Sequence, residues 1–183
     1  MPLVLNGATS GSTTLQSTDA VTATITLPST TGTVITTGNI PTGSVVQVVN
    51  ATYGSTVSTG TNTFVTTGLT ASITPTSSSN KILVLVSLVG VLKNTGNTCV
   101  ATKLYRNGSS LFVIDDSAGT TGSTAANGSG SISLNYLDSP ATTSSTTYAV
   151  FFASDNNINY AYINAWSNIG APLSTITLME IKA

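Results

Sequence analysis

The sequence contains no histidine and very little charge. Its 183 residues include five Lys or Arg and six Asp or Glu, so charged residues make up 6% of the chain, against about 25% in ordinary soluble proteins. Without histidine the chain lacks the commonest general base and cannot build a Ser-His-Asp arrangement. A single cysteine, Cys99, excludes an internal disulfide and a Cys/His zinc site. We therefore expect Cys99 to be a small buried core residue, and we expect no enzymatic activity.

The few acidic residues do not suggest a catalytic or metal site. Asp115 and Asp116 end a strand-like stretch, and neighbours on a strand point to opposite faces, so the two cannot form a glycosidase pair. Asp155 begins an Asp-Asn-Asn turn. A calcium contribution is the alternative for either group, and a glycan contact is a further alternative for 155–157. No glycine motif that cradles phosphate is present, and the prediction is that the protein has no cofactor and no resident metal.

Signals for secretion, membranes and nucleic acid are also missing. Met1 is followed by PLVLNG without a basic segment, and the longest apolar run, 82–92, is shorter than the roughly 20 residues of a membrane helix. A net charge of −1 gives no field that attracts nucleic acid or an anionic membrane. Asn50, Asn107 and Asn127 begin glycosylation sequons, which chance explains in a chain with 35 Thr and 25 Ser. We expect synthesis in a cytoplasm, with no membrane or nucleic-acid partner.

The residues that are abundant favour β-structure. Thr, Val and Ile have stiff side chains that fit a pleated sheet, and the mean hydropathy is +0.30. Asn107-Gly108 supplies the positive φ angles of a hairpin turn, and no helical periodicity persists. The fold prediction for residues 43–183 is an all-β, jelly-roll-like β-sandwich. The expected strands are 44–53, 62–68, 69–75, 81–92, the hairpin 98–115, 131–138, 146–154, 159–168 and 174–183.

Residues 1–42 have a different texture from the rest. They contain no aromatic residue and one charge, Asp19, with short alternating pieces at 13–16, 21–27 and 32–37. These residues contain too few large apolar side chains to form a hydrophobic core of their own. We therefore expect an extended arm that lies on a partner or on another copy. Its predicted contact residues are Leu3, Leu5, Leu15, Val21, Ile25, Leu27, Val34 and Ile35.

The aliphatic run at 82–92 is the strongest single signal in the sequence. Only Ser87 and Gly90 interrupt it. A strand with one wet face alternates, whereas a strand covered on both faces does not. One face would fill the sandwich core, and the prediction is that sibling subunits cover the other; cover by the chain's own loops is the alternative. Gly90 would mark a bulge where two backbones approach. The predicted interface residues are Ile82, Leu83, Val84, Leu85, Val86, Leu88 and Val89.

Aromatic residues gather late in the chain and leave two interpretations open. Core or interface packing is one, and a platform that stacks on a sugar is the other. Alternation places Tyr148 with Phe152 and apart from Phe151. Two stretches, 117–130 and 154–159, are predicted loops, the first of them long and exposed. The aromatic set is Tyr148, Phe151, Phe152, Tyr160, Tyr162 and Trp166.

Several stretches resemble virion proteins of tailed bacteriophages, usually labelled tail fibre or structural protein. The opening 1–38 resembles their N-terminal segments, and SITPTSSSNKILVLVSL, KLYRNGSSLF and STITLMEIKA resemble their C-terminal β-domains. The resemblance implies a β-rich, commonly trimeric virion structural protein without catalytic residues.

The short arm and single compact domain favour a small protein of the capsid surface over a complete long fibre. They favour a capsid cement or decoration protein, a homotrimer on the major capsid protein, made in the bacterial cytoplasm. The alternative is a short tail or head fibre that recognises host surface glycans.

Overall fold

The computed structural model describes residues 3–6, 12–15, 29, 35, 40–96, 98–118, 129–165 and 172–183. The chain divides into two compact units, Met1–Asn39 and Ile40–Ala183. Residues just before the predicted boundary at 42/43 lie in the second unit. There, Gly43 N donates a hydrogen bond to Lys182 O (2.8 Å), and Lys182 N donates to Ser44 O (2.9 Å). The start of the second unit is thereby tied to its C-terminal end.

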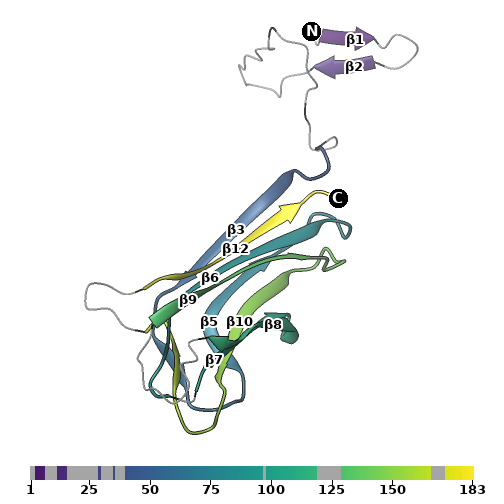
Figure 1. Cartoon of the computed structure of the whole chain (residues 1–183). Coiled ribbons are helices and arrows are strands. Elements are labelled where there is room, and N and C mark those ends of the chain that lie inside the picture. The colour runs from purple at the N-terminus through teal and green to yellow at the C-terminus, as the bar shows by residue number, and fades with distance from the viewer. Residues whose placement is uncertain are drawn as a thin grey trace. The chain divides into compact units, whose positions relative to one another are not determined.

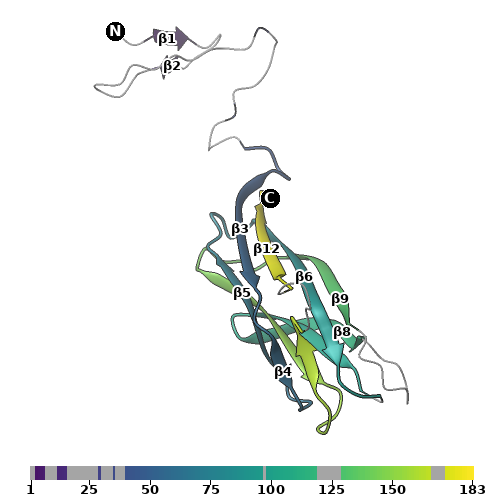
Figure 2. The ribbon, with the colours of Figure 1, turned by 90° about the vertical axis from the view of Figure 1, so that its left-hand side faces the viewer.

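The second unit is a sandwich of two antiparallel sheets, shown from two sides in Figures 1 and 2. The β6 sheet contains, in spatial order, β3 (Val45–Tyr53), β12 (Ser174–Ile181), β6 (Lys81–Lys93) and β9 (Ser129–Asp138). The short strand β11 (Ala161–Ile163) pairs with the end of β6 along the edge opposite β9, and β4 (Val57–Thr59) pairs with β11. The β10 sheet contains β5 (Val65–Ile73), β10 (Thr146–Ser154), β7 (Val100–Arg106) and β8 (Ser109–Ala118). Eight long strands in the orders β3-β12-β6-β9 and β5-β10-β7-β8 form a jelly roll. The all-β, jelly-roll prediction is confirmed.

The core lies between the two sheets and is filled mainly by alternate side chains of the long strands. Strand β12 alternates buried and half-buried residues along its whole length, as a strand with one core face must. Full burial of each large aliphatic or aromatic side chain contributes about 1.5–3 kcal/mol. Cys99 is buried, as predicted. The largest fully buried apolar side chains are Leu69, Ile73, Ile82, Leu88, Leu104, Tyr148, Phe152, Ile163, Ile176 and Leu178.

The hairpin prediction at Asn107-Gly108 is confirmed, with φ angles of 49° and 80° between β7 and β8. The two strands predicted over 62–75 form one strand, β5, because Gly68 adopts φ 82° and lets the strand continue past a register shift in its pairing with β10. A Cβ at Gly68 would lie 2.5 Å from the Tyr53 ring, so only glycine fits there. The strand predicted over 159–168 is shorter than expected, and β4 was not predicted.

The first unit contains one described element, an antiparallel ribbon. Strand β1 (Leu3–Asn6) pairs with β2 (Ser12–Leu15), and Leu3 is opposite Leu15. Ile35 is 62% exposed. The predicted contact residues Val21, Ile25, Leu27 and Val34 lie outside the described residues, as do 119–128 of the predicted loop 117–130. Nowhere in the described part of the chain does a helix have the length and apolar character that crossing a membrane requires.

Candidate functional site

The acidic side chains considered for catalysis or calcium serve local structure. Asp115 Oδ1 accepts a hydrogen bond from Ser117 N (2.9 Å), which shapes the end of β8. Asp155 Oδ1 accepts one from Thr98 Oγ1 (2.9 Å). Among the described residues, no three His, Cys, Asp or Glu side chains group closely enough to hold a metal ion. These carboxylates therefore give no support to a calcium site.

Glu180 is a fully buried carboxylate that holds one end of the sandwich together. Its Oε1 accepts hydrogen bonds from Thr76 N (2.7 Å), Thr76 Oγ1 (2.8 Å) and Asn80 Nδ2 (2.6 Å). Its Oε2 accepts one from Gln47 Nε2 (2.6 Å). Burial acts to raise the Glu180 pKa, but these hydrogen bonds stabilise the charged form and leave the pKa lowered. The network joins β12 to β3 and to the β5–β6 connection.

A second buried network joins the two sheets. Asp138, on β9, accepts hydrogen bonds from Arg106 Nη1 (2.9 and 2.8 Å) and from Tyr148 OH (2.5 Å). Hydrogen bonding to Asp138 raises the pKa of Arg106, and burial together with Asp138 raises the pKa of Tyr148. Both networks are satisfied within the chain, so we assign them to stability rather than to ligand binding.

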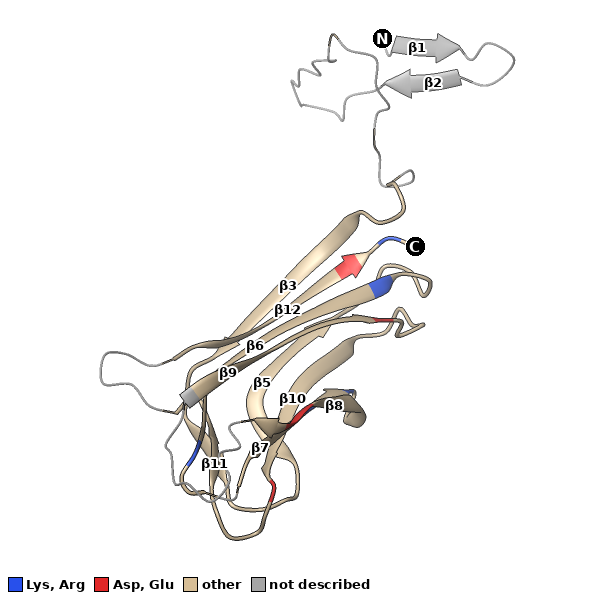
Figure 3. Ribbon diagram, in the orientation of Figure 1, with Lys and Arg blue, Asp and Glu red and all other residues tan. Residues whose placement is uncertain are grey.

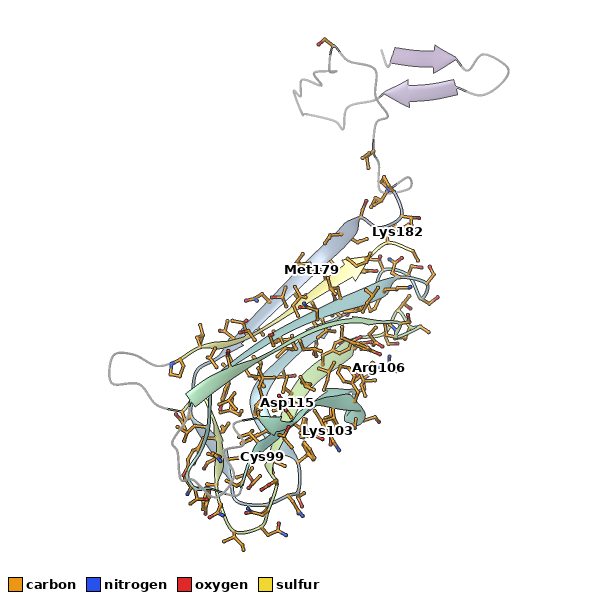
Figure 4. The ribbon with its side chains drawn as sticks, viewed as in Figure 1. Cys99, Lys103, Arg106, Asp115, Met179 and Lys182 are labelled. Carbon is orange, nitrogen blue, oxygen red and sulfur yellow. The ribbon has the colours of Figure 1, made fainter. Side chains whose placement is uncertain are left out.

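The outer face of the β6 sheet carries a row of four apolar side chains, which we name the outer apolar row: Val48, Met179, Leu83 and Leu137. Cross-strand pairing aligns them, because Met179 is opposite both Val48 and Leu83, and Leu83 is opposite Leu137. Val48 is 54% exposed and Leu137 48% exposed, while Leu83 and Met179 are half-buried. Figure 4 labels Met179 on β12. No described residue covers this row fully.

Apart from Lys81, the described residues in the rest of this face are uncharged. The next row is Asn50, Thr177, Leu85 and Asn135, and the one after it is Thr52, Thr175, Ser87 and Ser133. Lys81 stands at the margin, opposite Ile181. The carboxylates at the ends of β12 and β9, Glu180 and Asp138, are buried. Figure 3 shows how sparse the charged residues are over both sheets.

The seven residues predicted for the subunit interface lie on two different faces of β6. Ile82, Val84, Val86 and Leu88 are buried in the chain's own core and cannot form a surface between copies. Leu83, Leu85 and Val89 alternate with them and point outward, half-buried. Sequence reasoning missed Val48, Met179 and Leu137, although each lies in an alternating segment that has apolar residues on both faces. The outward-facing residues of β6 and this added set form the candidate interaction surface.

Gly90 divides β6 into two parts with different cover. It adopts φ 60°, and the pairing of β6 with β9 shifts there, so the predicted bulge is present. A Cβ at Gly90 would lie 2.5 Å from Ala165 O, because Ala165 N donates to Gly90 O (3.0 Å). Beyond the bulge, Val91 and Leu92 are both buried. The chain itself therefore covers the end of β6, whereas the stretch before Gly90 keeps an open outer face.

The predicted aromatic cluster separates into groups. Tyr148 and Phe152 lie together in the core, as alternation predicts. Phe151 is on the opposite side of β10 and stacks on Tyr105, with ring centroids 4.1 Å apart. On β7, Lys103 Nζ lies 4.2 Å from the centre of the Phe64 ring. The remaining pair, Tyr160 and Tyr162, has centroids 6.2 Å apart, and Trp166 lies outside the described residues.

Comparisons with known proteins identify no family. No family model matches the chain, and no curated protein matches its sequence. Among solved structures, the VP2 subviral particle of infectious bursal disease virus is 10% identical with a TM-score of 0.45, and the alignment covers 100% of this chain and 43% of that one. The structure of the Gx strain of the same virus is 10% identical with a TM-score of 0.41, and the alignment covers 76% of this chain and 37% of that one. The structure of the Gt strain is 12% identical with a TM-score of 0.42, and the alignment covers 98% of this chain and 46% of that one. The chain spans less than half the length of these proteins.

Proposed function

We propose that the protein is a virion structural protein, and specifically a bacteriophage capsid cement or decoration protein. In this proposal it forms a homotrimer through the outer face of the β6 sheet and binds the major capsid protein through its N-terminal arm. The observation that carries the proposal is the outer apolar row on an uncharged sheet face. The sequence resemblance to tailed-phage virion proteins supplies the setting.

The dimensions of this face suit contact between copies. Four strands about 4.8 Å apart, with nine residues rising about 3.3 Å each, present roughly 600 Å² of sheet. A standard interface buries about 800 Å² on each partner. Covering the outer apolar row, in which Val48 and Leu137 are about half exposed and Leu83 and Met179 less so, contributes roughly 2–4 kcal/mol per chain. An uncharged partner face is required, because a buried unpaired charge would cancel this gain, and a second copy supplies such a face.

The arm supplies a separate means of attachment. A two-stranded ribbon such as β1–β2 is marginal alone, and within the described residues neither of its outer edges is paired with another strand. Adding a strand from the capsid subunit, or from a neighbouring arm, would satisfy an edge by β-augmentation. Because the protein attached in this way binds the assembled shell and not the opened one, it raises the resistance of the shell to opening by mass action. Trimers suit the local threefold positions of an icosahedral shell.

The second candidate function is a short tail or head fibre that recognises host glycans. Figures 1 and 2 show that the connection between β10 and β11 lies at the end of the sandwich away from the start of β3. Ile158, in this connection, is 82% exposed, and Tyr160 at its end is 48% exposed. Exposed apolar and aromatic side chains at a free end favour recognition of a ligand.

Deletion of residues 1–39 tests the proposed mode of attachment. Because the first unit ends at Asn39, the shortened protein is expected to remain a soluble trimer and to lose binding to capsids in a co-sedimentation assay. Shortened protein that still binds capsids would refute the role of the arm. Copy number in purified virions separates the two functions, since a cement protein is present in proportion to capsid subunits and a fibre in far fewer copies.

A further inference from the structure

Tyr160 is an exposed aromatic ring that the chain holds in place. A Cβ built on Gly60 would lie 3.4 Å from Cζ of the Tyr160 ring, so the ring rests on the backbone at Gly60. The Tyr162 ring lies 6.2 Å away, centroid to centroid, and is tilted by 36°. With Gly60 on one side and 48% of its surface exposed, Tyr160 offers a fixed apolar surface to a ligand.

Two exposed carboxamides lie near Tyr160 in the fold, each oriented by a backbone hydrogen bond. Asn94 Oδ1 accepts from Tyr160 N (3.0 Å), and Asn94 N donates to Tyr160 O (3.2 Å). Asn157 Oδ1 accepts from Asn62 N (3.0 Å), two residues after Gly60. Because the oxygen of each carboxamide is engaged, the Nδ2 group is the one left to face solvent, and among the described residues neither Nδ2 donates to an acceptor.

The surroundings of Tyr160 are short of charge. Lys93, next to Asn94, is buried, and the carboxylate of Asp155 is already bonded to Thr98. With Lys93 buried, an anionic ligand would gain little compensation there for its desolvation. An apolar ring with neutral donors nearby suits a molecule with one C–H face and several hydroxyl or ring oxygens.

We propose that Tyr160, Asn94 and Asn157 form a binding site for a neutral carbohydrate at the free end of the sandwich. The ring of Tyr160 stacks on the apolar face of a hexose or N-acetylhexosamine, and the two Nδ2 groups donate hydrogen bonds to its oxygens. This inference rests on the second of the two functions proposed above, glycan recognition, and it names the site and the ligand class.

The test uses labelled full-length protein on an array of neutral, sialylated and sulfated oligosaccharides. Wild type is expected to bind neutral glycans. Y160A is expected to lose binding at least about tenfold, whereas Y160F, which keeps the ring, stays within about twofold. N94D and N157D keep the oxygen that orients the side chain but remove the donor, and each is expected to lose about threefold to tenfold. V113S, which removes an exposed apolar side chain on β8, is the control that should not change binding.

The outcomes distinguish failure of the site from failure of the function. If wild type and Y160A bind neutral glycans equally, with unchanged circular dichroism spectra, the site is wrong and glycan recognition stands. If only sialylated or sulfated glycans are retained, the neutral ligand class is wrong. If wild type retains no glycan, both the site and the second function are overturned, and the proposed trimeric assembly is unaffected.

Discussion

At the scale of single residues, two buried carboxylates stand out in this charge-poor protein. Glu180 and Asp138 each serve as a common acceptor for side chains from separate elements. A charge-poor sequence can thus contain charges that are structurally essential. Sequence analysis predicted the burial of Cys99 and the hairpin at Asn107-Gly108, which depend on local residue type. It could not pair Glu180 with Asn80, because these residues are 100 positions apart and only the fold brings them together.

E180Q is expected to reduce the free energy of unfolding at pH 7 by about 1–3 kcal/mol, because an amide cannot accept all four hydrogen bonds. The folded-state pKa of Glu180 lies below its ordinary value of 4.5. Its charged form therefore adds stability above pH 4.5, and this contribution is lost as pH falls further, through the folded pKa. Urea unfolding at pH 7 and pH 3 should show a smaller difference between E180Q and wild type at pH 3. D116N, at an exposed carboxylate, is the control, and an equal difference at both pH values would contradict the account.

Y148F tests the network between the sheets. It removes the hydroxyl that donates to Asp138 while keeping the buried ring. We expect a loss of about 1–2 kcal/mol in the free energy of unfolding, since Asp138 is left with a buried oxygen that has one donor fewer. Y105F is the matched control, because the Tyr105 ring stacks on Phe151 outside the core. Equal unfolding midpoints for Y148F and Y105F would show that the hydroxyl contributes nothing.

At the scale of the element, strand β6 explains the unusual aliphatic run. The run was predicted to be covered on both faces. In the structure, the parts of β6 before and after Gly90 differ in how their outer faces are covered. Beyond Gly90 both Val91 and Leu92 are buried, and the backbone of Ala165 is hydrogen-bonded to that of Gly90. Before Gly90 the inner residues fill the core and the outer ones form a surface with Met179 and Leu137. Periodicity alone could not locate this division, because it depends on a backbone contact with residues more than 70 positions later.

G90A is expected to destabilise the protein more than G108A, the matched substitution at another glycine with positive φ. Both Gly90 (φ 60°) and Gly108 (φ 80°) have left-handed backbone, so each alanine costs about 1 kcal/mol of strain. Only at Gly90 would the Cβ meet a backbone atom at 2.5 Å, whereas nothing lies within 4 Å at Gly108. The contact should add about 2 kcal/mol or more. Thermal unfolding of both variants measures the difference, and equal losses would argue against the close approach.

At the scale of the whole molecule, the sequence predicted the jelly-roll class because alternation and turn residues agree along most of the second unit. The candidate surface was only partly predictable. Its β6 residues were visible as an unbroken run, but Val48, Met179 and Leu137 lie on three other strands, and only strand order and register align them. A surface assembled from four strands is a property of the fold rather than of any one segment.

The most direct test of the proposed assembly is sedimentation velocity of the full-length protein over a range of concentrations. Wild type is expected to sediment as a trimer. L83T/M179T, which replaces the centre of the outer apolar row with residues that suit a strand, is expected to sediment as a monomer with an unchanged circular dichroism spectrum, while V113T on the other sheet remains trimeric. Wild-type protein that stays monomeric at high concentration would contradict the account.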